Sequence, residues 1–113
     1  MESQLQYLKE VADTVDEFKQ EMPSAFAAQT AFTDAVYADG ALDTRTKRLM
    51  AVAIAVQKGC PGCITYQTRM AVEAGATKQE VIEAAAVATS IGGTSANAWV
   101  WIVVKMLKEM NKL

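Results

Sequence analysis

The sequence predicts an all-α fold, and three observations support this prediction. Apolar residues recur at three- and four-residue steps in several segments, strand-like alternation is absent, and residues typical of helix ends separate the segments. The chain has 113 residues, a length that fits one domain spanning residues 1–113. We therefore expect every regular segment of this chain to be a helix.

Two helices are predicted before the first glycine, at about residues 2–21 and 23–37. The first carries one apolar stripe, made of Leu5, Leu8, Val11, Ala12, Val15 and Phe18. The second begins with Pro23, which is well tolerated in the first turn of a helix. The turn at residues 38–41 then ends it.

A third helix is predicted to begin at Asp43 or Thr44, both good cap residues, and to run to about Lys58. Its centre, residues 49–56, is apolar on every side, which favours a position in the core or in a subunit interface. A buried strand is the alternative for eight such residues, but the polar approach through residues 45–48 favours a longer helix.

Three further helices follow. Gly59 ends the third helix, and a fourth is predicted from Cys60 to Ala74. The fifth begins at Thr77, where the spacing to Glu80 matches a capping box, and runs to about residue 90. The last is expected to run unbroken from residue 94 or 95 to 112, with Trp99 and Ile102 among the residues of its apolar side.

Composition narrows the class of protein. The 11 basic and 13 acidic residues are spread along the chain, so nucleic acid is not expected as a partner. The longest apolar run is far shorter than the roughly 20 residues needed to span a bilayer, and the N-terminus does not resemble a signal peptide. We therefore expect a cytoplasmic protein that does not enter membranes. Because 51% of the residues are apolar, we also expect it to associate with copies of itself.

The chain contains two cysteines and no histidine. A metal site usually needs about four ligands, so a Cys/His zinc site within one chain is excluded, although one shared between subunits stays open. No dinucleotide-binding motif is present, so no organic cofactor is expected.

The two cysteines form the motif Cys60-Pro61-Gly62-Cys63, directly after Gly59 and at a predicted helix start. The positive end of the helix dipole favours a thiolate there, and only the thiolate attacks a disulfide or a peroxide. Two cysteines one turn apart can also close a disulfide with little movement. We therefore predict thiol–disulfide chemistry at this pair, with two inert buried cysteines as the alternative.

Cys60 is predicted to attack first, because a cap residue is expected to be more exposed and nearer to the dipole end.

Three stretches, residues 46–56, 59–67 and 71–84, resemble in order those of the carboxymuconolactone decarboxylase family. They are most similar to its alkylhydroperoxidase D-like branch, over about residues 42–101. The resemblance implies a bundle of about six helices that assembles into homotrimers or homohexamers. It also implies reduction of peroxides or disulfides by the cysteine pair, which an external thiol or disulfide donor would restore.

The sequence departs from that branch at two positions. The branch usually has a histidine four residues after the second cysteine and a glutamate twelve residues before the first, where this chain has Gln67 and Arg48. An amide has no useful pKa, so Gln67 cannot act as a general base. Arg48 lowers a thiol pKa only if it points at the site, and a solvated or interface position is the alternative. Tyr66 adjoins the site in sequence, but a packing role is expected to be commoner than proton donation.

These replacements predict an oxidoreductase that is weak as a peroxidase. Peroxide cleavage needs a proton delivered to the leaving oxygen, whereas a thiolate of low pKa leaves a disulfide without one. Two alternatives stay open. One is a decarboxylase acting on a carboxymuconolactone-like acid that an arginine could bind, and the other is a non-catalytic oligomeric module.

Overall fold

The computed structural model describes residues 2–112, and all of its regular structure there is helical. The helices are α1 (Gln4–Lys19), α2 (Pro23–Tyr37), α3 (Thr44–Lys58), α4 (Pro61–Glu73), α5 (Lys78–Gly92), α6 (Thr94–Asn97) and α7 (Val100–Glu109). Six of these are full helices and α6 is a single turn, so the predicted all-α class is confirmed. Within the same residues, no helix is both long and apolar enough to cross a bilayer.

Helix starts follow the cap residues found in the sequence. The Asp43 side chain accepts a hydrogen bond from the Thr46 N–H at 2.7 Å, which fixes the start of α3. At the start of α5, Thr77 and Glu80 accept from each other's backbone N–H groups in a full capping box. The groups that set these two helix starts therefore lie within four residues of one another in the sequence.

The last predicted helix is interrupted. The expected continuous helix to residue 112 is instead α6 followed by α7, with Ala98 and Trp99 between them. The apolar side predicted for this segment is otherwise correct, since Ile102 and Val103 are fully buried. The interruption was missed because it contains neither glycine nor proline, the two strongest breakers visible in a sequence.

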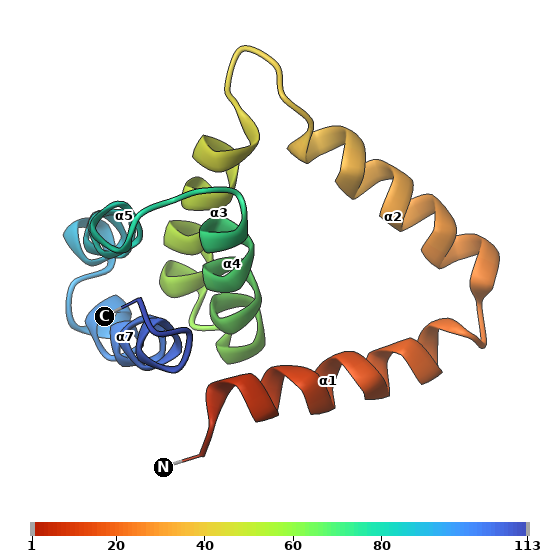
Figure 1. The fold of residues 1–113 in the computed structure, drawn as a ribbon, viewed down its shortest axis with the longest axis horizontal. Coiled ribbons are helices and arrows are strands. Elements are labelled where there is room, and N and C mark those ends of the chain that lie inside the picture. The colour runs from red at the N-terminus through yellow and green to blue at the C-terminus, as the bar shows by residue number, and fades with distance from the viewer. Residues whose placement is uncertain (1, 113) are drawn as a thin grey trace.

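The hydrophobic core lies among α3, α4, α5 and α7, which together with α6 we call the body (Figure 1). Its fully buried side chains of large or β-branched type are Val52, Val56, Ile64, Val81, Ile102, Val103, Met106 and Leu107. Only one face of α3 enters this core. Met50 and Ile54, on its other face, remain exposed, which agrees with the apolar character of this segment on all sides.

Helices α1 and α2 form an arm that extends away from the body before the chain returns to α3 (Figure 1). Of the apolar stripe predicted for this first helix, Leu8 is buried. Leu5, Val15 and Phe18, in the same stripe, are exposed. Helix α2 contains no buried residue. The predicted apolar stripe is therefore present on α1 but is buried only near the start of the helix, because the rest of α1 extends away from the body.

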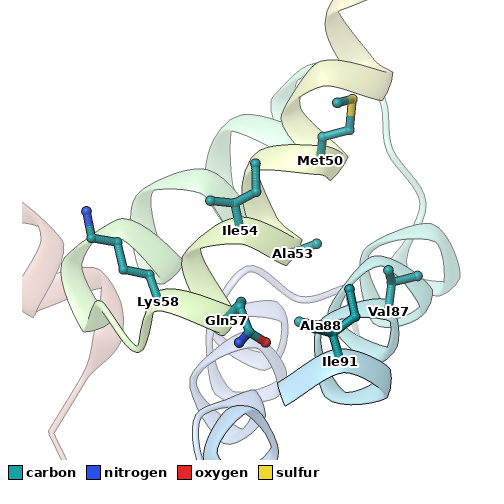
Figure 2. Close-up of a pocket in the computed structure, with 8 residues that line it drawn as sticks. All are labelled: Met50, Ala53, Ile54, Gln57, Lys58, Val87, Ala88 and Ile91. Atoms are coloured by element: carbon teal, nitrogen blue, oxygen red, sulfur yellow. The ribbon is translucent and has the colours of Figure 1, made fainter. Parts of the chain in front are cut away.

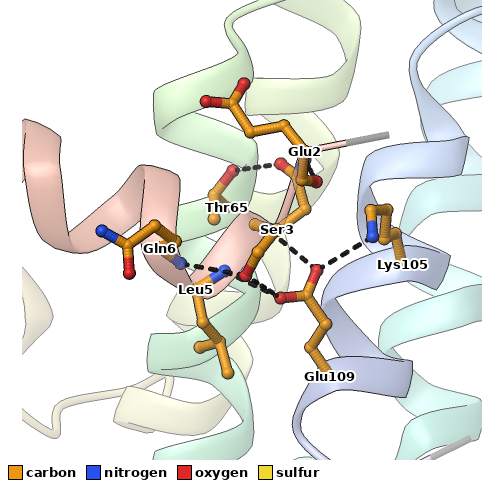
Figure 3. A network of polar contacts seen from close by, with 8 residues as sticks. Glu2, Ser3, Leu5, Gln6, Thr65, Lys105 and Glu109 are labelled. Carbon is orange, nitrogen blue, oxygen red and sulfur yellow. Dashed lines mark hydrogen bonds and ion pairs between the residues drawn. The ribbon is translucent and has the colours of Figure 1, made fainter.

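Glu109 fastens the N-terminus of the arm to α7 (Figure 3). Its carboxylate accepts hydrogen bonds from Ser3 Oγ at 2.6 Å, from Gln4 N at 2.7 Å and from Leu5 N at 3.1 Å. Lys105 lies 3.4 Å from the same carboxylate. Burial acts to raise the pKa of Glu109, but these hydrogen bonds outweigh it and lower the pKa to about 2.

Candidate functional site

The site is built on the start of α4. Cys60 is the N-cap residue, and its Sγ accepts a hydrogen bond from the Cys63 N–H at 3.2 Å. Pro61 follows at the first helical position, where a backbone N–H would have no partner within the helix, so its absence costs no hydrogen bond. The two cysteines are joined in a disulfide with their Cα atoms 5.2 Å apart. The predicted cap position and the predicted ability of the pair to close a disulfide are both present.

The exposure of the two sulfur-bearing residues is the reverse of the expectation. Cys63 is exposed, whereas Cys60 is only partly exposed. Cys60 directly follows Gly59, which packs closely against Trp99, and both Gly59 and Cys60 are partly covered there. Cys63 lies on the solvent-facing side of the first turn of α4. The exposure argument for first attack by Cys60 was therefore wrong. The electrostatic argument gains support, because Cys60 Sγ receives a backbone N–H.

Trp99 is the tryptophan that borders the site. Gly59 adopts a left-handed backbone with φ of 70°, and a Cβ at this position would lie 2.8 Å from Trp99 Nε1. Glycine is therefore required here twice, for its backbone conformation and for the close approach of the indole. Trp101 lies apart from this contact and lines a shallow cleft with residues 104, 105 and 108.

Arg48, Gln67 and Tyr66, three residues singled out from the sequence, come together one turn beyond Cys63. Arg48 Nη1 donates a hydrogen bond to Gln67 Oε1 at 3.1 Å, and its guanidinium carbon lies 6.0 Å from the centre of the Tyr66 ring. Arg48 is only 7% exposed, so the alternative of a solvated arginine is wrong for this chain. The position that carries a glutamate in the resembling branch thus carries a buried cation.

The arm supplies two tyrosines that sequence reasoning missed. The Tyr37 ring covers the Arg48 guanidinium, with 3.6 Å between the guanidinium carbon and the ring centre. Tyr7 lies beside the cysteine motif, since a Cβ at Gly62 would meet the Tyr7 hydroxyl at 3.6 Å. Both tyrosines are more than ten residues from the motif, and no local signal connects them to it. Only the path of the arm past α3 and α4 does so.

The arrangement can carry out disulfide exchange and little acid–base chemistry. The closed pair stores two oxidising equivalents, and Cys63 is the exposed residue of the pair. Among residues 2–112, no group of three potential ligands drawn from histidine, cysteine, aspartate and glutamate is placed to hold a metal ion.

Comparison with known proteins identifies the family. The model of the carboxymuconolactone decarboxylase family matches residues 23–106, which is most of the chain and more than the stretch recognised from the motifs. The chain belongs to the carboxymuconolactone decarboxylase family. Two curated relatives are uncharacterized proteins. One from Cupriavidus necator is 38% identical over 66% of this chain and 66% of its own length. The other, uncharacterized protein 4 in the cox locus of Paracoccus denitrificans, is 40% identical over 72% of this chain and 73% of its own length.

Two solved structures share the fold of this family member. A carboxymuconolactone decarboxylase family protein from Legionella pneumophila matches with a TM-score of 0.90 at 30% identity, covering 98% of this chain and 100% of its own. A family protein from Thermotoga maritima, whose description suggests a part in an antioxidative response, matches with a TM-score of 0.81 at 27% identity. That match covers 93% of this chain and 90% of the Thermotoga chain. Because the Legionella match covers 98% of this chain, it includes most of the arm as well as the body.

Proposed function

We propose that this chain is a thiol–disulfide oxidoreductase that works through Cys60 and Cys63. The observation that carries the proposal is the disulfide at the first turn of α4, with one sulfur accepting a helix N–H and the other residue exposed. An external thiol donor would return the pair to the reduced state in a reducing compartment such as the cytoplasm. The antioxidative role suggested for the Thermotoga relative agrees with this chemistry.

Peroxide reduction is expected to be slow. At the two positions where the resembling branch carries its histidine and glutamate, this chain has Gln67, an amide, and Arg48, a cation, and neither is suited to deliver a proton to a leaving oxygen. A positioned acid typically contributes about 10²–10⁴-fold to such a step. Disulfide exchange avoids this loss because the Cys60 thiolate is stabilised by the Cys63 N–H and by the helix dipole.

The direct test measures the redox state of the pair by alkylation and mass spectrometry. The reduced protein is mixed with a small disulfide or with an organic hydroperoxide, and the oxidised fraction is followed with time. We expect oxidation by the disulfide at least about 100-fold faster than by the peroxide, for the proton-transfer reason given above. The Cys63→Ser variant should trap a mixed disulfide on Cys60. Peroxide turnover as fast as disulfide exchange, or thiols inert to both reagents, would refute the proposal.

A decarboxylase is the second candidate, because the family name and the buried Arg48 both fit an acidic substrate. Such a reaction would not oxidise the pair. Release of carbon dioxide from a carboxymuconolactone-like acid by the Cys60→Ser/Cys63→Ser variant would favour this candidate. Failure of that assay together with inert thiols would leave a non-catalytic oligomeric module.

We also propose that the protein is a homo-oligomer, a trimer or hexamer. Helices α3 and α5 border an apolar cleft of about 430 Å³ (Figure 2), lined by Met50, Ala53, Ile54, Gln57, Lys58, Val87, Ala88 and Ile91. Ile54 is 63% and Ile91 79% exposed there, while Phe32 on the arm is 70% exposed. One chain thus carries both an unpartnered apolar helix and an unpartnered apolar cleft, which two copies could cover mutually.

A further inference from the structure

Arg48 is a buried cation, and residues 2–112 supply no counter-ion to it. Among the residues that the structure describes, no carboxylate oxygen lies within 4.0 Å of its side-chain nitrogens, although Arg45, one turn earlier on α3, is paired with Glu80 at 2.7 Å. The Nε of Arg48 is buried and donates to nothing. Burying an arginine in this state is costly unless another group supplies the missing acceptors and charge.

The groups that surround Arg48 hold it in place and leave its charge unbalanced. The Tyr37 ring covers one face of the guanidinium at 3.6 Å, and the electron-rich face of an aromatic ring attracts a cation. Gln67 accepts one of the five N–H bonds that a guanidinium can donate. A planar, fixed guanidinium with unused donors matches the geometry of a carboxylate, which accepts two parallel hydrogen bonds.

The position of this group relates it to the cysteines. Gln67 lies one turn after Cys63 on α4, and Tyr66 lies three residues after it, so both partners of Arg48 face the region next to the reactive pair. Tyr37 ends α2, the helix that buries no residue, so the ring that covers the guanidinium comes from the arm and not from the hydrophobic core.

We propose that Arg48, held by Tyr37 and Gln67, binds the carboxylate of an acidic small-molecule disulfide while its sulfur atoms react at the cysteine pair. This inference rests on the proposed oxidoreductase function and names its substrate class. The Cys60 thiolate attacks one sulfur of the substrate, which forms a protein–substrate disulfide and releases one substrate thiolate to take a proton from water. Cys63 then loses its proton to water, attacks Cys60 and releases the second thiolate. The substrate gains the two electrons that the protein pair loses, and an external dithiol returns them.

The kinetic test compares two disulfides of similar size, the dianionic dithiodipropionate and the neutral bis(hydroxyethyl) disulfide. The measured quantity is the ratio of their rate constants with the reduced protein. In Arg48→Met we expect the ratio of the dithiodipropionate rate constant to the bis(hydroxyethyl) disulfide rate constant to fall about 10- to 100-fold. This is the factor expected from losing one pair of charge-assisted hydrogen bonds. Arg48→Lys should restore part of it. Arg45→Met removes the same charge from the same helix and should keep the ratio, since Arg45 already has its carboxylate.

A second measurement is independent of sulfur chemistry. Suberate, in which two methylene groups replace the two sulfurs of dithiodipropionate, should raise the Tm of the wild type and of Arg45→Met but not of Arg48→Met. An unchanged ratio in Arg48→Met together with equal stabilisation of all variants by suberate would overturn the carboxylate site. If neither disulfide oxidises the wild type while suberate still stabilises it through Arg48, the oxidoreductase proposal fails and the anion site stands.

Discussion

The body and the arm of this molecule use apolar residues in opposite ways. In the body, α4 and α7 each bury apolar side chains completely in the core, and Ile64 and Leu107 expose essentially nothing. In the arm, α2 is equally helical and rich in alanine and phenylalanine, yet it buries no residue. The body therefore builds a core within one chain and leaves apolar surface exposed only on its outer faces, as in the α3–α5 cleft, whereas the arm leaves nearly all of its apolar surface exposed.

The arm is held by polar contacts at its two ends. Glu109 accepts three hydrogen bonds at the start of α1. At the end of α2, Lys47 Nζ donates to the carbonyl oxygens of Val36 at 2.8 Å and Ala38 at 2.7 Å, which satisfies groups that a helix end leaves free. These two attachments place Tyr7 beside the cysteine motif and Tyr37 over the Arg48 guanidinium. The comparison teaches that the arm's position is set by a few polar contacts rather than by a core.

The largest expected effect is a loss of stability in the body, at the contact between Gly59 and Trp99 beside the cysteine pair. Gly59→Ala should lower the free energy of unfolding by about 2–4 kcal/mol, because the new methyl group meets Trp99 and the backbone is in the left-handed region. Urea unfolding of the oxidised protein measures it. Gly62→Ala is the matched control, since its Cβ would make only an ordinary contact with Tyr7. Equal losses in both variants would contradict the role given to Trp99.

A second prediction tests whether another copy covers the apolar surface. Ile54→Glu should weaken self-association about 10- to 100-fold, because it replaces an apolar side chain by a charge in the cleft between α3 and α5. Analytical ultracentrifugation over a range of concentrations measures the change. Ile54→Ala should have a smaller effect, and the stability of the isolated chain should stay within about 0.5 kcal/mol since Ile54 is exposed. An unaltered mass distribution in both variants would exclude this cleft from the interface.

The smallest expected effect concerns the hydrogen bonds that attach the start of the arm to Glu109. Because the pKa of Glu109 is lowered to about 2 from 4.5, its ionised form stabilises the folded state. That contribution is complete above about pH 4.5 and is lost as the pH falls from there towards 2. Glu109→Gln should cost about 1–2 kcal/mol at neutral pH, remove this pH dependence and speed amide hydrogen exchange at the start of α1.

Glu73→Gln is the control for that experiment. Glu73 lies 3.6 Å from Arg69 in a largely exposed pair, so its replacement should change stability by less than about 0.5 kcal/mol. If exchange at the start of α1 is as slow in Glu109→Gln as in the wild type, packing of Leu8 and not Glu109 holds the arm.

Much of this structure was predictable because its determinants are local. The cap residues Asp43 and Thr77, the glycine that ends α3 and the cap position of Cys60 all act through hydrogen bonds or backbone angles within a few residues. The break before Val100 was not predictable in this way, since Ala98 and Trp99 include neither of the strong helix breakers, glycine and proline.

The sequence by itself determined the helical class, the helix starts and the placing of two cysteines one turn apart, because side-chain periodicity and capping are short-range properties. Tertiary structure alone decided that Arg48 is buried, that Tyr37 and Tyr7 reach the site and that Cys63 is the more exposed cysteine residue. Each of these depends on the path of one helix past another, which no local pattern of residues encodes. Burial and charge balance at the site are therefore set by packing between the arm and the body.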